Sequence, residues 1–319
     1  MRKGQNPAKF VKDVAKPERI TAAMLTYIPF LSGFYEETLD VLKVSLDSMR
    51  RDAGLPFDLL VFDNGSCPEA RDYLIQEKEE GRIQYLILSE KNVGKGGAWN
   101  VILAGAPGEI IAYADSDVLF SPNWLARSVE ILETYPNVGM VTARPYRTPP
   151  EFYSATLDWA RQSDKATLED GQFIPWETFL EFNLSLGQTE EENVKVYAET
   201  KDWKLTYNGV SAMAGASHWQ FTAYKSILQQ FLPFDMSRPM GQVRQLDQRM
   251  NDTGLLRLMV PDPLAMNMSN TLGYLREELG KKDVRSKKKK GIFSRFLELA
   301  PIKKVLLAVY NKIFNWYYS

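Results

Sequence analysis

Glu109-Ile110-Ile111-Ala112-Tyr113-Ala114-Asp115-Ser116-Asp117 is an apolar run that ends in two carboxylates one residue apart. The run has the length and composition of a buried strand. Side chains alternate across a strand, so Asp115 and Asp117 are expected on one face while Ser116 points away. Two carboxylates on one face can bind a hard divalent cation. The alternative is a pair of capping residues before a helix that starts near Ser121-Pro122.

Strand-like and helix-like segments alternate around this run, from residue 20 to 143. This pattern predicts an α/β fold with a Rossmann-like, mostly parallel sheet and helices on both faces. Ligands of such sheets bind beyond the carboxyl ends of the strands. The expected strands are Ile20–Tyr27, Leu59–Phe62, Ile83–Leu88 and Ile110–Ala114, and the expected helices are 36–53, 68–80 and 96–105.

Polar clusters follow each of these strands: Thr26-Tyr27, Asp63-Asn64-Gly65-Ser66, Ser89 to Gly97, and Asp115-Ser116-Asp117. The third cluster places glycines between a strand and a helix, where the backbone can approach an anion. A tight turn without a ligand is the alternative. The cluster lacks the glycine and hydroxyl positions of a phosphate-binding Walker loop, and no Gly-x-Gly-x-x-Gly follows the first strand. ATP hydrolysis and dinucleotide redox chemistry are therefore disfavoured.

Composition and charge limit the classes of protein that fit. The chain has 319 residues, is 45% hydrophobic and has one cysteine, Cys67, so it can bury a large core and cannot form an internal disulfide. No apolar secretory segment follows its start, and a cytoplasmic location is expected. Residues 281–319 contain eleven Lys or Arg and two acids, a net charge of +9, which leaves −10 on the rest of a chain with a net charge of −1.

We expect four parts along the chain: a polar leader (1–19), a nucleotide-binding α/β subdomain (20–145), a subdomain for the acceptor and the catalytic base (146–280), and a basic amphipathic tail (281–319). Residues 144–205 lose the regular alternation and are rich in Pro, Trp, Phe and Glu. Such a segment is typical of an insertion or lid that shapes a binding site.

The tail combines a lysine run, Lys287–Lys290, with apolar residues at helical spacing from Ile292 to Tyr317. This pattern predicts C-terminal amphipathic helices that lie on an anionic membrane surface. The residues from Ile302 to Tyr317 are too few and too charged to span a bilayer. Packing against the body of the protein or against a second copy in a homo-oligomer is the alternative. Nucleic-acid binding is disfavoured because no motif accompanies the lysines.

Taken in order and spacing, Thr26-Tyr27, Val61–Ser66, Asn92-Val93-Gly94 with Ala98 and Asn100, and Asp115-Ser116-Asp117 resemble the motifs of family 2 glycosyltransferases. This resemblance covers roughly residues 20–145. A weaker match continues through Ala214–Phe221, Pro233-Phe234-Asp235 and Leu246-Asp247 to Gly254. The resemblance implies a GT-A fold, which binds a nucleotide-sugar.

The resemblance also implies roles for residues of the donor site. Asp63 would read the base of the nucleotide, with Thr26 and Tyr27 lining the same pocket; a carboxylate can accept the N–H of uracil. Asn92, Gly94 and Lys95 would lie near the ribose and diphosphate. Asp117 resembles the direct ligand of Mg²⁺ or Mn²⁺, and Asp115 the carboxylate that holds the ribose or a metal-bound water. The metal would neutralise the departing nucleoside diphosphate.

Inverting transfer needs a general base for the acceptor hydroxyl, and the resemblance makes Asp247 the candidate, with Asp235 in reserve. The family has two consecutive acids here, whereas this chain has Leu246 before Asp247. A surface salt bridge with Arg244 or Arg249 is the alternative role of Asp247.

His218, the single histidine, would bond the diphosphate or the acceptor, or is a packed histidine. Asn267 stands where related enzymes can supply a late histidine ligand, so metal dependence is a weaker expectation than the fold.

The expected protein is thus an inverting glycosyltransferase of the cytoplasm or the inner membrane face. It would move a sugar from a nucleotide-sugar, with a UDP-sugar favoured, to a hydroxyl of a glycan, lipid-linked or small acceptor. A nucleotidyltransferase and a non-catalytic carbohydrate-binding scaffold are the rival hypotheses. The first rival is weakened because Thr26-Tyr27-Ile28-Pro29 follows the first strand, where a triphosphate site would need a glycine-rich, basic loop.

Overall fold

The computed structural model describes residues 4–237 and 242–273, and chain contacts divide the protein into two units, Met1–Thr271 and Leu272–Ser319. All helices and strands named in this section lie in the first unit. The predicted amphipathic tail, 281–319, lies outside the described residues. Within the described ranges, no helix has both the length and the apolar character that a membrane crossing requires.

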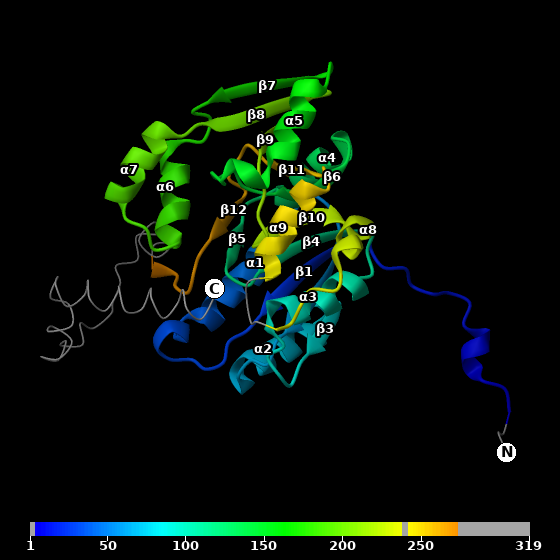
Figure 1. Cartoon of the computed structure of the whole chain (residues 1–319). Helices are drawn as coiled ribbons and strands as arrows, with labels where there is room; N and C mark the ends of the chain where they lie inside the picture. The colour runs from blue at the N-terminus through cyan, green and yellow to red at the C-terminus, as the bar shows by residue number, and fades with distance from the viewer. Residues whose placement is uncertain (1–3, 238–241, 274–319) are drawn as a thin grey trace, which may run out of the picture. The chain divides into compact units, whose positions relative to one another are not determined.

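Ten strands of the described residues form one sheet, in the order β3-β2-β1-β4-β10-β6-β11-β9-β8-β7 (Figure 1). Strands β3, β2, β1 and β4 are parallel, and β6 and β11 pair in parallel. The predicted α/β class with a mostly parallel sheet is confirmed for this half. The strands are β1 (Ile20–Thr26), β2 (Asp58–Asp63), β3 (Tyr85–Leu88), β4 (Ile110–Asp115), β6 (Val138–Thr142), β7 (Ala166–Gly171), β8 (Asp202–Tyr207), β9 (Val210–Ala214), β10 (Gln220–Tyr224) and β11 (Leu256–Met259).

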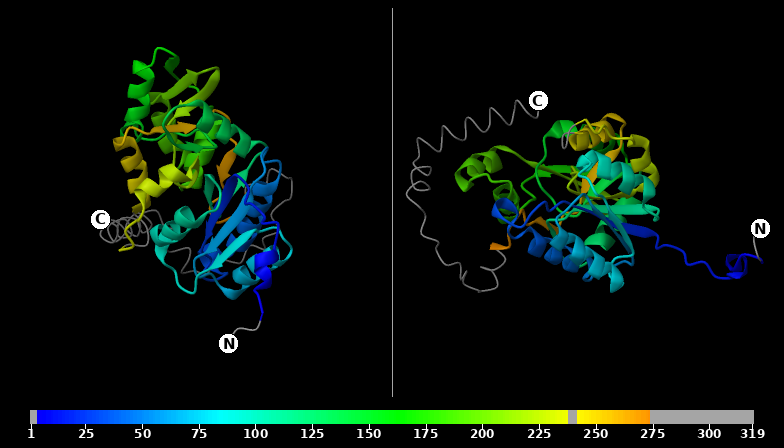
Figure 2. Two further views of the ribbon diagram at one scale, coloured as in Figure 1. Left: turned by 90° about the vertical axis from the view of Figure 1, so that its right-hand side faces the viewer. Right: turned by 90° about the horizontal axis from the view of Figure 1, so that it is seen from below.

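Helices cover both faces of this sheet, as the alternation predicts (Figure 2). Alternate residues of β1 enter two separate cores: Ala22 and Met24 pack with α1, α2 and α4, whereas Ala23 and Leu25 pack with α3, α8 and α9. The helices are α1 (Thr38–Arg50), α2 (Pro68–Glu79), α3 (Gly94–Gly105), α4 (Trp124–Thr134), α5 (Ser154–Gln162), α6 (Trp176–Ser185), α7 (Glu190–Glu199), α8 (Lys225–Leu228) and α9 (Gln242–Asp252). The two cores place the ends of β1 and β4 between fixed layers.

The sheet is less uniformly parallel than the sequence pattern suggests. Strand β10 lies antiparallel between β4 and β6, although more than 100 residues separate it from β4 along the chain. Strands β7, β8 and β9 extend the same sheet in an antiparallel manner. Residues 144–205, which lack the alternation, therefore contribute strands to the main sheet together with helices α5, α6 and α7. The boundary predicted at residue 145 stays a prediction, and one sheet runs through both sides of it.

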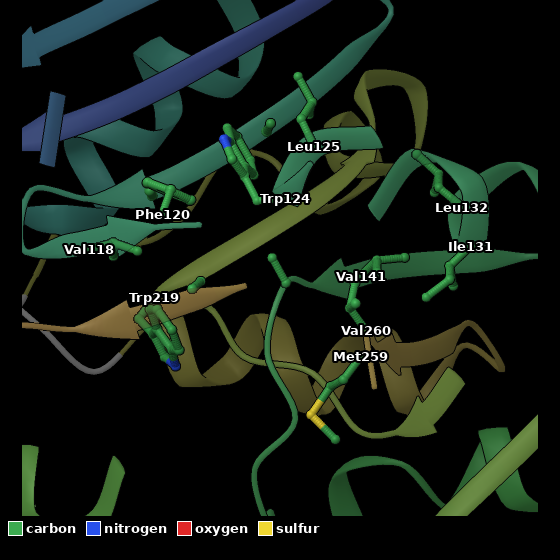
Figure 3. Close-up of a cluster of buried hydrophobic side chains, with 14 of the residues drawn as sticks. Val118, Phe120, Trp124, Leu125, Ile131, Leu132, Val141, Trp219, Met259 and Val260 are labelled. Carbon is green, nitrogen blue, oxygen red and sulfur yellow. The ribbon is translucent and has the colours of Figure 1, made fainter. Parts of the chain in front are cut away.

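A second, two-stranded sheet pairs β5 (Val118–Phe120) with β12 (Ala265–Asn267). Val118 and Phe120 of β5 pack beside Trp124 of α4 in the larger hydrophobic core (Figure 3). This packing anchors the segment that follows the two carboxylates. It also brings the chain after β12 next to Asp117, because the backbone N–H of Met268 donates to the carbonyl of Asp117 at 2.7 Å.

Candidate functional site

A cleft of about 270 Å³ opens at the carboxyl ends of β1 and β4. One side carries Asp115, Ser116, Asp117 and Lys95, and another carries aromatic residues that follow β1. This is the edge at which a parallel sheet binds its ligands. The lining also includes Tyr27, Phe34, Tyr35, Ser269 and Asn270. Asn270 donates a hydrogen bond to the carbonyl of Phe34 at 2.7 Å, so the segment after β12 and the segment after β1 meet at the rim.

The two carboxylates both line this cleft, but not by strand alternation. Strand β4 ends at Asp115, and Ser116 and Asp117 form a turn before β5. Ser116 therefore lines the cleft too, and the expectation that it points away is wrong. The capping alternative is also wrong, because Asn123 is the cap of α4 and β5 separates the carboxylates from that helix.

Asp115 has partners on both of its oxygens. The Lys95 ammonium donates to Oδ2 at 2.7 Å, and the Tyr113 hydroxyl donates to Oδ1 at 2.6 Å. The charged form of Asp117 is disfavoured. Burial, and then the charge of Asp115, raise the pKa of Asp117 to about 7. A cation bound here would relieve the repulsion between the two carboxylates.

The donor set fits a metal that is shared with a ligand. Within the described ranges, no group of three or more His, Cys, Asp or Glu side chains is arranged to hold a metal ion. Mg²⁺ is commonly held by one or two carboxylates together with substrate phosphates and water. Asp115 and Asp117 meet that requirement only if a diphosphate supplies further oxygens. Asn267 pairs with Val118 next to Asp117, but its side-chain oxygen accepts from Ser269 N–H at 2.6 Å.

The glycine-rich segment forms the start of α3, with Gly94 at φ +71°. That conformation favours glycine, which explains the residue at this position. The Asn92 side-chain oxygen accepts from Gly94 N–H at 2.8 Å, and Asn64 donates to the same oxygen at 3.0 Å. The segment is therefore tied to the turn after β2. The amino end of α3 and Lys95 together make this edge attractive to an anion.

Thr26 and Asp63 are register partners at the ends of β1 and β2. Asp63 is fully buried, accepts from Ser66 N–H at 3.2 Å, and lies 3.7 Å from Nε of Arg71. The Thr26 hydroxyl is buried and has no hydrogen-bond partner among the described residues. Neither residue lines the 270 Å³ cleft, whereas Tyr27 does and is 38% exposed. The base-reading role of Asp63 stays a prediction.

Asp247 and His218 meet on the other side of β4. Asp247 Oδ2 lies 2.6 Å from Nδ1 of His218, and Oδ1 lies 2.6 Å from Nη2 of Arg257. His218 precedes β10, whereas Arg257 lies in β11, the strand that follows α9. Asp247 is only 6% exposed, so it is a buried ion-pair residue. Arg249, one of the two partners expected in a surface salt bridge, instead donates to the carbonyl of Phe231.

The sequence of this chain also resembles known proteins. Residues 33–183 match the sequence profile of Glycosyl transferase family 2. This segment, just under half of the chain, is similar to glycosyltransferase family 2. Thr26 and Tyr27 precede the matched segment, and His218 and Asp247 follow it, so the match does not cover these four residues.

An uncharacterized glycosyltransferase of Nostoc sp. is 33% identical over 84 residues, which are 26% of this chain and 26% of that protein. A mannosyltransferase from Pyrobaculum calidifontis, solved with GDP-Man and Mn²⁺, has 17% identity and a TM-score of 0.48 over 82% of this chain and 59% of its own. GalNAc-T7, solved with UDP, GalNAc and Mn²⁺, has 12% identity and a TM-score of 0.46, over 79% of this chain and 44% of its own. The matched part of this chain therefore spans less than two thirds of each of these proteins.

A larger hollow of about 490 Å³ lies elsewhere on the protein, near Leu59 at the beginning of β2 and Gln84 just before β3. Its arginines, Arg50 and Arg82, are both paired with Glu77. The amino ends of parallel strands are not where such sheets bind ligands. Size therefore does not identify the site, and the smaller cleft is the stronger candidate.

Arg257 is the site residue that the sequence analysis missed. It is 1% exposed in β11 and donates to Asp247 and to the carbonyls of Ala216 and Phe152. A signal was present in the sequence, since one arginine interrupts the apolar run Leu255–Val260. A charge in a buried strand usually has a buried partner. Ser269 and Asn270, by contrast, reach the cleft because β12 pairs with β5. No local sequence pattern predicts that pairing.

Proposed function

We propose that this protein transfers a sugar from a nucleotide-sugar, with a UDP-sugar favoured, to a hydroxyl group of a glycan, lipid-linked or small acceptor, with inversion at the anomeric carbon. One observation carries the proposal. The carboxylate and lysine cleft and the Asp247–His218 pair lie at the end of the same strand, because the N–H of Asp115 donates to the carbonyl of Trp219 at 2.8 Å. Donor chemistry and proton acceptance would therefore occur side by side.

On the donor side, Lys95 and the amino end of α3 would hold the diphosphate, and Tyr27 and Asp63 would hold the base. Asp115 and Asp117 would bind Mg²⁺ or Mn²⁺ jointly with the diphosphate. The metal, when bound, supplies positive charge that stabilises the leaving nucleoside diphosphate. Lys95 lies 2.7 Å from Asp115 and supplies positive charge next to it. Binding of the donor would require this lysine to share its contact with the metal or the phosphate.

On the acceptor side, the Asp247–His218 pair would accept the proton of the attacking hydroxyl. Attack from the face opposite the leaving diphosphate forms the new bond while the old one breaks, so the configuration inverts. Leu246 replaces the first acid of the family doublet and is fully buried under α9, which leaves Asp247 as the acid of this helix nearest the site.

The place of the protein in the cell also belongs to this proposal. A cytoplasmic enzyme attached to the inner membrane face by residues 287–319 fits the lysine and apolar pattern of the sequence. A lipid-linked acceptor would then be presented at the same surface. Self-association through the tail is the competing role of that segment.

The proposal is tested by incubating the protein with Mn²⁺ and UDP-glucose, UDP-galactose, UDP-N-acetylglucosamine, GDP-mannose or dTDP-rhamnose, each with octyl glycosides as acceptors. Release of nucleoside diphosphate and an NMR spectrum of the product give the donor and the anomeric configuration. Retention of the donor's configuration would exclude the inverting mechanism. Nucleotide-sugar binding without any transfer would favour the carbohydrate-binding scaffold, and pyrophosphate release from a nucleoside triphosphate would favour the nucleotidyltransferase.

A further inference from the structure

We infer that the Nε2 atom of His218 takes the proton from the acceptor hydroxyl, and that Asp247 holds the imidazole in place instead of accepting the proton itself. The inference rests on the proposed function, because it assigns roles within that reaction. It reverses the roles that the family resemblance suggests for these two residues.

Asp247 is poorly placed to act as the base. Both of its oxygens already accept charge-assisted hydrogen bonds, from Arg257 on one side and His218 on the other, each at 2.6 Å. Its side chain is 8% exposed and that of Arg257 is 1% exposed. A proton on Asp247 would leave the guanidinium charge of Arg257 buried without its counter-ion, which is strongly unfavourable.

Arg257 cannot move away to release Asp247. Its other hydrogen bonds go to the backbone carbonyls of Phe152 and Ala216, and its own backbone N–H donates to the Thr156 hydroxyl at 2.9 Å. The guanidinium is therefore fixed by three segments of the chain. This arrangement pairs one oxygen of Asp247 with a fixed guanidinium and leaves its second oxygen in contact with His218.

His218 is better placed for proton transfer. Its side chain is 28% exposed, compared with 8% for Asp247, so an acceptor arriving from solvent meets the imidazole first. A carboxylate next to Nδ1 requires the proton on Nδ1, which leaves the lone pair on Nε2. No described residue hydrogen-bonds that atom.

The backbone holds His218 beside the donor cleft. It lies in the tight turn between Ser217 and Gln220, which form an isolated β-bridge just before β10. Gln220 pairs with Ala114 of β4, and the following register places Trp219 opposite Asp115. The N–H of Ser217 donates to the Thr142 hydroxyl at 2.9 Å, which fixes the turn from the β6 side. The imidazole is thus positioned before any substrate binds.

The proposed step balances in atoms and charge. The acceptor oxygen forms a bond to the anomeric carbon, and its proton moves to Nε2 of His218. The bond between the anomeric carbon and the phosphate oxygen breaks, and its electron pair leaves with the nucleoside diphosphate. The imidazolium formed faces the Asp247 carboxylate, which stabilises it, and later returns the proton to water.

Several charged or titratable groups surround His218. They are Asp247 of α9, Arg257 of β11 and, across the Trp219 carbonyl, Asp115 with its partner Lys95. Tyr146, which follows β6, interacts electrostatically with Arg257 and Asp247. Burial raises the pKa of this phenol, so it stays neutral over the pH range of the assay. If the activity falls at acid pH, the group responsible can therefore be identified by comparing that fall with a direct titration of His218.

That titration is direct because His218 is the single histidine of the chain. ¹⁵N NMR of the imidazole should show the Nδ1–H tautomer, and Asp247→Asn should alter it. With a donor that the wild-type protein turns over, the acid limb of kcat/KM should coincide with the NMR titration of His218. A protonated Nε2 in the neutral protein would overturn the inference.

Variants separate catalysis from packing. His218→Gln should lower kcat by about 10²- to 10⁴-fold, as expected for loss of a general base, and leave the affinity for the nucleotide unchanged. Added imidazole should partly restore His218→Ala. Asp247→Asn should lower kcat and shift the acid limb, and urea unfolding of this variant measures how much stability is lost when Arg257 has no counter-ion. Asp252→Asn, an exposed acid at the end of the same helix, is the control and should behave as wild type.

The outcomes are distinguishable. A His218→Gln variant that keeps the wild-type rate and acid limb, with an inactive Asp247→Asn variant, would make Asp247 the base and overturn the inference alone. A wild-type protein that turns over no donor in the panel would remove the proposed function itself, and the role of His218 with it.

Discussion

Replacing Leu246 with glutamate is predicted to destabilise this protein increasingly as the pH rises. Leu246 stands where the family resemblance places the first acid of a doublet, yet it is fully buried in the core shared by α3 and α9. A carboxyl at this position would have to stay protonated in the folded protein, since burial disfavours the charged form. The substitution would therefore restore the two consecutive acids of the family and remove a buried leucine from the hydrophobic core.

The magnitude follows from the burial. Losing the buried leucine costs about 1.5–3 kcal/mol for any polar replacement. An unfolded glutamate has a pKa of about 4.3, so a folded carboxyl that stays neutral loses a further stability of about 1.4 kcal/mol for each pH unit above that value. The sign is that of an acid with a raised pKa in the folded state. The extra cost reaches about 3.7 kcal/mol at pH 7.

The assay is urea unfolding of Leu246→Glu and Leu246→Gln at pH 5, 6 and 7, followed by tryptophan fluorescence. The glutamine variant shares the loss of apolar burial but cannot ionise, so it is the matched control. The difference between the two variants should grow with pH along the stated slope. A difference that stays flat from pH 5 to 7 would mean that residue 246 faces water, which would refute the placement of α9 and with it the positions of Asp247 and Arg257.

Three further predictions concern other parts of the protein. Burial and the Asp115 charge raise the pKa of Asp117 to about 7, so this carboxyl lowers stability as the pH rises from about 4 towards 7; Asp117→Asn should raise the Tm of the metal-free protein more at pH 8 than at pH 5, and equal rises would contradict the burial. Gly94→Ala should destabilise by about 1–2 kcal/mol in urea unfolding because φ is +71°, whereas Gly105→Ala at the other end of α3 should be neutral or stabilising; equal effects would exclude the left-handed turn. Removing residues 287–319 should abolish sedimentation with vesicles that contain phosphatidylserine, and retained binding would reject the interfacial role of the tail.

The first half of the fold was predictable because its signals are local. Apolar runs such as Ile20–Thr26 and Ile110–Asp115 alternate with segments of helical spacing, and each strand ends in residues that favour a turn. Strand β10 was not predictable as the neighbour of β4. Its pairing joins residues that are more than 100 positions apart, and an antiparallel strand between two parallel ones has no signature in its own sequence.

The site was predictable in part for the same reason. Lys95 follows β3, and Asp115 and Asp117 lie at the end of β4, so the topology of a parallel sheet brings them to one edge. The Asp247–His218 contact required tertiary structure, because α9 and the turn before β10 are joined only by their packing on the sheet. Ser116 was misplaced because strand alternation stops where β4 ends, one residue before it.

The measurement that tests the central claim most directly is the Tm of the full chain with UDP-, GDP- and dTDP-sugars, each with and without Mn²⁺. A ligand that binds only the folded state raises the Tm, by mass action. The account predicts a rise with one class of nucleotide that depends on Mn²⁺ and that disappears in Asp117→Ala. No rise with any of these donors, or a rise that Asp117→Ala leaves unchanged, would contradict a nucleotide-sugar site at the ends of β1 and β4.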